Sequence, residues 1–237
     1  MTDKTDNMDF DFTPYFKKYE ELVGAAEEAF KRVKNDHADC VHCKVGCADC
    51  CHAVFDLTLI EALYINHKFK ATFTGEKLKP LLERANRSDR KVHKIKKRAH
   101  KLLKEGYKDE EILEQIAAET VRCAFLNDQD LCDLYDFRPI TCRLYGVPTA
   151  IGGKAHTCGL SGFSKGATYP TANLDRIQSA LMALSNALVA DLKSKYTTMG
   201  EMLVPLSMAL LTDYDDEYLG LKGETEDSPE SMGGANE

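Results

Sequence analysis

Nine cysteines, grouped in two parts of the chain, constrain this sequence more than any other feature. Five lie within the stretch CVHCKVGCADCC at 40–51, and four follow between 123 and 158. Thiolates are soft ligands that suit zinc and iron–sulfur clusters, and a zinc site needs about four ligands roughly 2.3 Å from the ion. A short segment delivers two or three ligands and a distant segment completes the set. We therefore expect the two groups to fold onto each other around metal, with eight ligands: Cys43, Cys47, Cys50, Cys51, Cys123, Cys132, Cys142 and Cys158.

Two other interpretations of the cysteines stay open. Free cysteine is often a small buried hydrophobic residue, although nine in two clusters are many for that role. The second interpretation is a cytosolic redox dithiol, but no Cys-x-x-Cys lies on a predicted strand-to-helix turn, as it does in thioredoxin-like proteins. The adjacent Cys50 and Cys51 indicate two metals, or one ligand beside a supporting thiol. The spacing fits two four-thiolate sites and one multinuclear centre equally well.

The bulk composition bears on the compartment and the partners. With 237 residues, of which 43% are apolar, the chain is long enough to bury a core without metal. Its formal net charge of −7 gives no support to a global attraction to nucleic acid or anionic lipid. No apolar run is long enough to span a bilayer, and the acidic start MTDKTDNMDFDF is unlike a signal peptide. We therefore expect a cytoplasmic protein without a membrane partner. In the reducing cytoplasm, clustered cysteines hold metal more often than they form disulfides.

Hydrophobic periodicity predicts a mainly α fold, a helical domain with two cysteine-rich irregular segments that form a metal site. We predict a single helical domain over 13–212 with a metal-binding core at 40–165, between a disordered acidic arm at 1–12 and a disordered acidic tail at 213–237. Thr13 is the expected N-cap of the first helix, and Thr58 and Glu61 are expected to form a capping box. The predicted helices cover 13–35, 58 to before 75, 76–105, 109–122, 171–196 and 199–211, with irregular chain at 123–170.

The predicted helix at 76–105 is strongly basic, and most of its Lys and Arg residues lie between 84 and 104. A run of like-charged residues usually forms a solvated face of a helix. The acidic ends of the chain also balance the positive charge of this helix. The helix at 84–104 is nevertheless a candidate surface for an acidic protein partner. We do not expect nucleic acid to be that partner.

A centre built from thiolates is negatively charged and needs cations and hydrogen-bond donors around it. Arg138 and Arg143 flank Cys142, and we predict that at least one of them supports the cofactor. Three histidines adjoin cysteines and are weaker ligand candidates: His42, His52 and His156. Cys40 is expected to be a structural or spare thiol.

The two cysteine segments resemble the YkgJ-type cysteine-cluster family, a zinc- or iron-chelating domain. The family has a CxxCxxCC-like start and a later block of the form C…C-x-x-Y-x-x-R-P-x-x-C-R. The start is here Cys43-Lys-Val-Gly-Cys47-Ala-Asp-Cys50-Cys51. The later block begins at Cys123, continues from Cys132 through Tyr135, Arg138 and Pro139 to Cys142 and Arg143, and closes with Cys158. The resemblance covers roughly residues 40–165. The chain departs from the family in its first gap, which has three residues in place of two, and in the long basic insert between the blocks.

The resemblance implies a protein that binds metal or an iron–sulfur cluster. One branch of the family is similar to flagellin lysine N-methylases, which use S-adenosylmethionine, but no glycine-rich nucleotide loop supports that activity here. The leading function is metal binding, with a [4Fe–4S] cluster favoured over zinc because eight thiols exceed the need of one zinc ion. The alternatives are a methyltransferase-like or redox enzyme that uses the cluster, and a non-enzymatic metal-transfer or interaction module.

Overall fold

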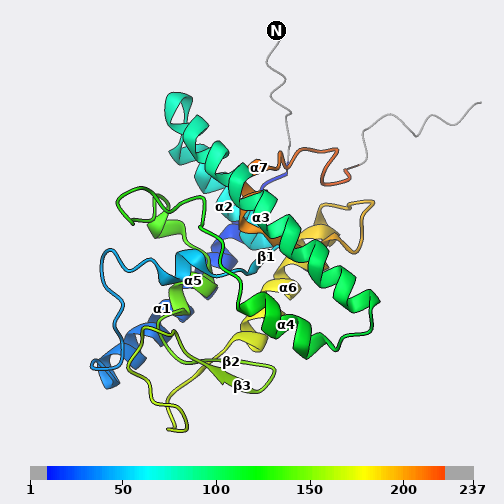
Figure 1. Ribbon diagram of the computed structural model, residues 1–237. Helices are drawn as coiled ribbons and strands as arrows, with labels where there is room; N and C mark the ends of the chain where they lie inside the picture. The colour runs from blue at the N-terminus through cyan, green and yellow to red at the C-terminus, as the bar shows by residue number, and fades with distance from the viewer. Residues whose placement is uncertain (1–9, 222–237) are drawn as a thin grey trace, which may run out of the picture.

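Helices dominate the computed structural model, which describes residues 10–221, and the predicted mainly α class is confirmed (Figure 1). The parts of the predicted arm and tail at 1–9 and 222–237 lie outside the described residues. The helices are α1 (Thr13–Asp36), α2 (Leu59–Thr72), α3 (Leu78–Lys104), α4 (Asp109–Ala117), α5 (Ile140–Leu144), α6 (Leu174–Asp191) and α7 (Leu206–Leu211). The strands are β1 (Asp56–Thr58), β2 (Thr149–Ile151), β3 (Lys154–His156), β4 (Ala172–Asn173) and β5 (Leu203–Pro205).

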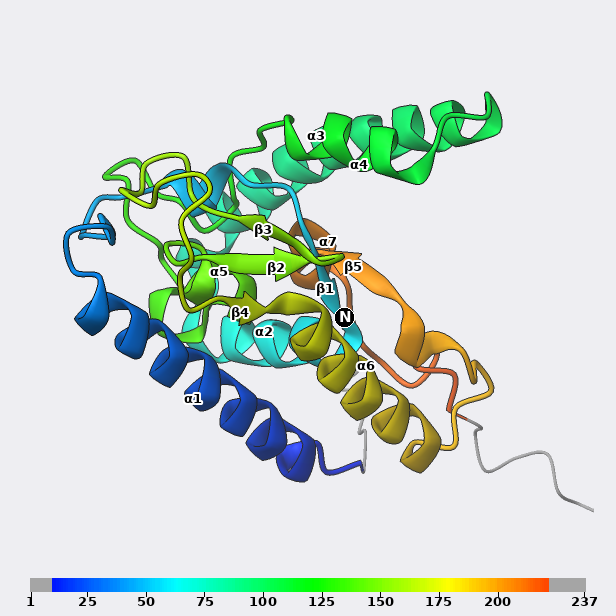
Figure 2. The same ribbon diagram turned by 90° about the horizontal axis from the view of Figure 1, so that it is seen from below.

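Helix α2 is the centre of the hydrophobic core. Leu59, Ile60 and Ile65 have no exposed surface, and apolar side chains occur on all sides of the first turns. A helix that is apolar all round must be covered on all sides. The surrounding helices α1, α6 and α7 provide that cover, and α3 packs against α7 (Figure 2).

Two small sheets connect distant parts of the chain. Strand β1 follows the first cysteine segment and pairs antiparallel with β5, with Leu57 opposite Val204. The other sheet has the order β3-β2-β4, in which β2 and β3 form a hairpin and β4 runs parallel to β2. The hairpin lies between Cys142 and Cys158, so it fixes the path of the chain between these two residues.

Several predicted helix boundaries are wrong, one because of a local residue and two because of contacts with distant segments. The predicted helix at 199–211 is a short 3-10 turn, strand β5 and then α7, because Pro205 has no N–H to donate and disfavours helix in the residue before it. The helix predicted at 109–122 ends at Ala117, since Val121 instead donates its N–H to the carbonyl of His52. The helix predicted at 171–196 covers only 174–191, because Ala172 and Asn173 pair with β2.

The ends of the described chain also differ from the predictions. Phe12, not Thr13, is the N-cap residue of α1. Beyond the predicted end of the domain at 212, Tyr214 and Leu219 are buried in the core, so the packed chain continues into the segment predicted as tail. The capping box of α2 is present as predicted.

Glu61 does more than cap α2. Its side chain is buried, and one carboxylate oxygen accepts hydrogen bonds from the Thr58 N–H and hydroxyl, each at 3.3 Å. The other oxygen accepts from the Ile140 N–H at 3.3 Å, at the start of α5. Glu61 therefore ties the helix after the first cysteine segment to the helix that carries Cys142.

We predict that Glu61→Ala lowers the free energy of unfolding by about 2–4 kcal/mol, because it removes a helix cap and leaves buried N–H groups without acceptors. Urea denaturation measures the loss. The matched control is Glu21→Ala, which removes an exposed carboxylate from α1 and should cost less than about 0.5 kcal/mol. Equal losses in the two variants would contradict the role of Glu61.

The pH dependence of this loss has a defined sign. Burial raises the pKa of Glu61 above its ordinary value. Such a carboxyl stabilises the fold below its unfolded-state pKa, about 4.3, and loses that contribution as the pH rises through the folded-state pKa. The difference in unfolding free energy between wild type and Glu61→Ala should therefore be largest at acid pH. A difference that grows toward neutral pH in a series of urea titrations would refute this.

Candidate metal centre

Backbone hydrogen bonds join the two cysteine segments at both ends of the first one. Near its end, the N–H of Cys123 donates to the carbonyl of Cys51 at 2.7 Å. At its start, the N–H of Gly162 donates to the carbonyl of Cys40 at 2.8 Å. The residues between these two links are held in irregular turns and a 3-10 turn at Asp49–His52. The early and late thiols are brought together by these links between main chains.

A tight loop brings Cys132 back beside Cys123. The N–H of Asn127 donates to the carbonyl of Leu131 at 2.9 Å, and Cys132 forms a bridge with Leu126. The loop is anchored from outside by Arg84 of α3, whose guanidinium donates to the carbonyl of Ala124 at 2.8 Å. Arg84 also binds the carboxylate of Asp133 at 2.5 Å. The loop thus brings together the thiols of Cys123 and Cys132, which eight residues separate in the sequence.

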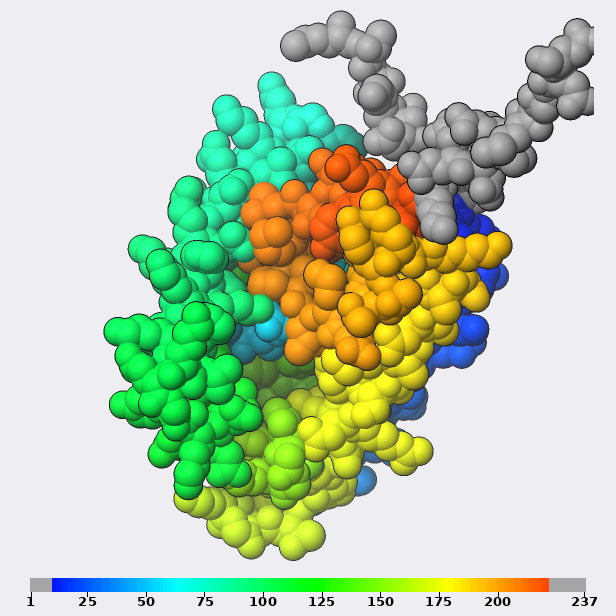
Figure 3. Space-filling model, turned by 90° about the vertical axis from the view of Figure 1, so that its right-hand side faces the viewer, coloured from blue at the N-terminus to red at the C-terminus, as the bar shows by residue number. Residues whose placement is uncertain are grey.

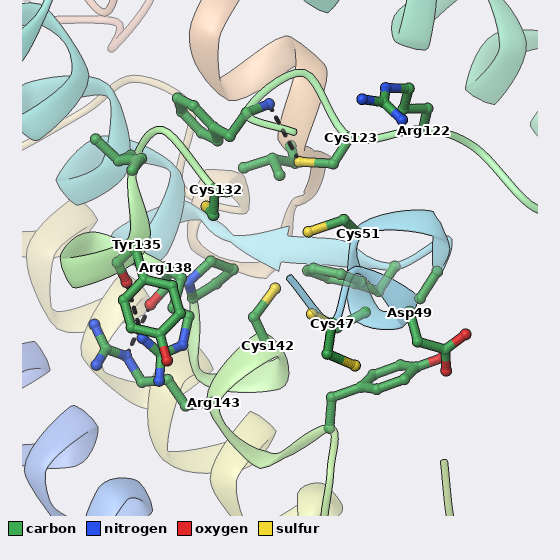
Figure 4. A pocket seen from close by; sticks show the side chains of 18 of the residues that line it. Cys47, Asp49, Cys51, Arg122, Cys123, Cys132, Tyr135, Arg138, Cys142 and Arg143 are labelled. Atoms are coloured by element: carbon green, nitrogen blue, oxygen red, sulfur yellow. Dashed lines mark hydrogen bonds between the residues drawn. The ribbon is translucent and has the colours of Figure 1, made fainter. Parts of the chain in front are cut away.

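All eight predicted ligands line one cavity of about 620 Å³. Figure 4 shows the sulfur atoms of Cys51, Cys132 and Cys142 directed toward the same space, with Cys123 at its edge. The thiols surround this space and do not meet at one point: in the described chain, no three or more His, Cys, Asp or Glu side chains converge closely enough to hold a single metal ion.

The innermost thiols interact with one another. Interaction of the Cys50 sulfur with the thiols of Cys142 and Cys51 lowers the pKa of Cys50 and raises the pKa values of the other two. Burial raises the pKa of Cys123 to about 12, and it also raises the pKa of Cys132. Without a bound cation, these pKa directions favour a thiolate at Cys50 and protonated thiols at the cysteines around it. A bound metal would supply the positive charge that lets the others ionise.

The outer thiols line a second cavity as well. Cys43, Cys47 and Cys158 face both the large cavity and a neighbouring one of about 440 Å³. Cys158 also lies 3.2 Å from a carboxylate oxygen of Asp49. These three cysteines, with Lys44, Gly46 and Gly146, line both cavities. The other five predicted ligands, here called the inner thiols, line only the larger cavity: Cys50, Cys51, Cys123, Cys132 and Cys142.

Gly146 leaves the space that Cys43 occupies. A Cβ atom at position 146 would lie 2.1 Å from the Cys43 sulfur, far inside van der Waals contact. The side chain of Cys43 therefore rests directly on the backbone after α5.

The two arginines have different surroundings. Arg143 is buried, and its guanidinium donates to the carbonyls of Arg138 at 2.9 Å and Asp136 at 2.5 Å and pairs with Glu27 of α1. Arg138 is half-buried and stacks on the ring of Tyr135, with 3.9 Å between its guanidinium carbon and the ring centroid.

Both arginines line the large cavity, but only the charge of Arg138 acts on the pKa values of the thiols. It acts to lower the pKa values of Cys43 and Cys132, against the larger opposing effect of burial. Arg143 fixes the loop that carries Arg138.

The remaining candidates lie outside the thiol cavity. Both ring nitrogens of His42 face carbonyl oxygens, those of Leu160 at 2.6 Å and Asp39 at 3.1 Å. His52 forms a hydrogen bond within its own turn, and His156 is exposed on β3. Cys40 packs against the hydrophobic core and lines neither cavity.

Part of the lining of the large cavity is apolar. It is formed by Val54 and Phe55 before β1, Val92 of α3, Val121 and Leu206. Figure 3 shows a hollow between the α3–α4 pair and the segment of β5 and α7. The lining of the cavity thus includes both thiols and hydrocarbon side chains.

Sequence reasoning missed Arg84, Asp49 and the contact of Glu61 with α5. Arg84 had a detectable signal, because it falls on the inward side of α3, one residue from the buried Ala85. The other two depend on contacts between distant segments and have no local signal.

Comparison with known proteins bears on residues 42–159, which match the model of the CxxCxxCC family, described as a putative zinc- or iron-chelating domain. Comparisons with curated proteins and with solved structures found no match. Among the described residues, no helix combines the length and apolar character that crossing a membrane requires.

The contact between Gly146 and Cys43 makes a prediction about reactivity. Gly146→Ala should push the Cys43 thiol outward and speed its alkylation by iodoacetamide several-fold, as followed by peptide mass spectrometry, while the fold is kept because a flexible side chain can move. Gly159→Ala is the matched control, since nothing lies within 4 Å of its added Cβ. An unchanged rate for Cys43 in Gly146→Ala would show that the contact does not exist in solution.

Proposed function

Because the chain belongs to the family of zinc- or iron-chelating CxxCxxCC domains through residues 42–159, we propose that it holds an iron–sulfur cluster between its two cysteine segments. The ligands are drawn from Cys43, Cys47, Cys50, Cys51, Cys123, Cys132, Cys142 and Cys158. Zinc bound by the same thiols is the alternative. The observation that carries the preference is the arrangement of the eight thiols around a cavity of about 620 Å³, where one zinc ion would need four sulfurs at one point.

The protein's own groups are suited to stabilising thiolates. The N–H of Phe125 donates to the Cys123 sulfur and the N–H of Leu160 to the Cys158 sulfur, each at 3.4 Å. Such donors, with a nearby cation such as Arg138, lower the negative charge on a thiolate centre and adjust its potential. When bound, an iron–sulfur cluster would supply one-electron redox chemistry.

The apolar part of the cavity lining favours a second candidate function. A centre held at the thiol wall leaves space beside Val54, Phe55 and Leu206 for an organic molecule. The chain would then be an enzyme that acts on such a molecule next to its cluster. Equilibrium dialysis of the anaerobic protein with S-adenosylmethionine tests the methyltransferase-like version, and no retention of that compound removes it.

Metal content of anaerobically purified protein tests the leading proposal. We expect a brown protein with iron and acid-labile sulfide, and Cys142→Ser should lose most of both because Cys142 lies among the inner thiols. Cys40→Ser is the matched control and should retain them, since Cys40 lines neither cavity. Colourless protein that contains zinc would show that the bound metal is zinc and not an iron–sulfur cluster. Wild-type protein that binds neither metal under reducing conditions would refute the proposal.

A further inference from the structure

We propose that the solvent face of α3 is a docking surface for an acidic segment of a partner protein. The surface, here called the basic stripe, consists of seven exposed side chains: Arg87, Arg90, Lys91, Lys94, Lys97, Lys101 and Lys104. The proposal concerns a different face of the molecule from the thiol cavity and does not depend on the metal.

The stripe follows from the helical repeat. Its residues recur at intervals of three and four, which places them on one side of an α-helix. Val92 and Ile95 are buried on the opposite side. From Arg87 to Lys104 the stripe extends for about 25 Å at a rise of 1.5 Å per residue. Its cations thus form a straight row on a helix that projects with α4 from the body of the protein (Figures 1 and 2).

The rest of the protein does little to neutralise this row. Other basic residues of α3 have partners in the body: Arg84 with Asp133, Lys96 with Asp56, and Arg98 with Glu119. Within the stripe, the ion pairs of the described chain include only that of Lys101 with Glu105 at 3.5 Å.

The row is therefore costly for the free protein. Like charges at these spacings repel one another and destabilise a helix. In a chain with a net charge of −7, the stripe is a local positive region that an anionic partner would neutralise.

The surroundings of the stripe favour an acidic protein segment over nucleic acid. α3 contains no Phe, Tyr or Trp on which bases could stack. The neighbouring α4 exposes Asp109, Glu110, Glu111 and Glu114. These carboxylates would repel the phosphates of a nucleic acid broad enough to cover both helices. A narrow helix or extended segment with carboxylates along one side can lie on α3 alone and match its row of cations.

Binding of fluorescein-labelled poly-L-glutamate tests the proposal. A chain of about 20 residues is long enough to span the stripe, and fluorescence anisotropy with the full-length protein measures its affinity. We expect binding at low salt that weakens as salt is added. The triple variant Arg90→Glu/Lys94→Glu/Lys97→Glu should weaken binding at least about tenfold. The full-length protein failing to bind poly-L-glutamate at low salt would overturn the proposal.

A matched variant separates the stripe from net charge. Lys17→Glu/Arg32→Glu/Lys165→Glu makes the same change in charge at exposed positions outside α3 and should change the affinity by less than about twofold. Equal weakening by the two triple variants would overturn the proposal, because binding would then follow net charge alone. Far-UV circular dichroism checks that both variants are folded.

Two further measurements define the partner class and the independence from metal. Single-stranded and duplex DNA of similar length should bind more weakly than poly-L-glutamate; tighter binding of DNA that is lost in the α3 variant would overturn the assignment to an acidic protein. Metal content should be the same in wild type and the α3 variant. A loss of metal with the stripe would overturn the claim that the two surfaces are independent.

Discussion

The hydrogen bonds between the main chains of the two cysteine segments are the constraint on which the site depends. The bond from Cys123 to Cys51 joins the segments at the end of the first one, and the bond from Gly162 to Cys40 fixes its start. Thiols on irregular turns gain little from their own packing, because free cysteine side chains are small. The backbone must hold them near one another before any metal arrives.

The arrangement also has an electrostatic cost that gives the site its chemistry. Five of the thiols face only the large cavity, where burial and mutual contact oppose the ionisation of more than one of them. Backbone donors to sulfur and the half-buried Arg138 reduce that cost without removing it. A cationic inorganic centre is what completes the balance of charge, because metal binding exchanges protons for positive charge on the same sulfurs.

The sequence predicts the helices that have a clear hydrophobic face and the groups of thiols, but not the contacts between segments. The repeat in α1 and the capping box of α2 are local patterns, so they could be predicted. Pro205 is a local signal for the break between β5 and α7, but the pairing of β5 with β1, about 145 residues earlier, has no local signal. The two layers of cysteines, inner and outer, follow from the folding of the late segment around the early one, which the spacing alone left open.

Alkylation of the cysteines before and after metal loading is the most direct test of the central claim. Peptide mass spectrometry would follow each thiol in the full-length protein under reducing, anaerobic conditions. If the two segments share a centre, thiols at 43–51 and at 123–158 become protected together on loading and lose protection together when a chelator removes the metal. Protection confined to one segment, or lost at different chelator concentrations in the two, would contradict a shared centre.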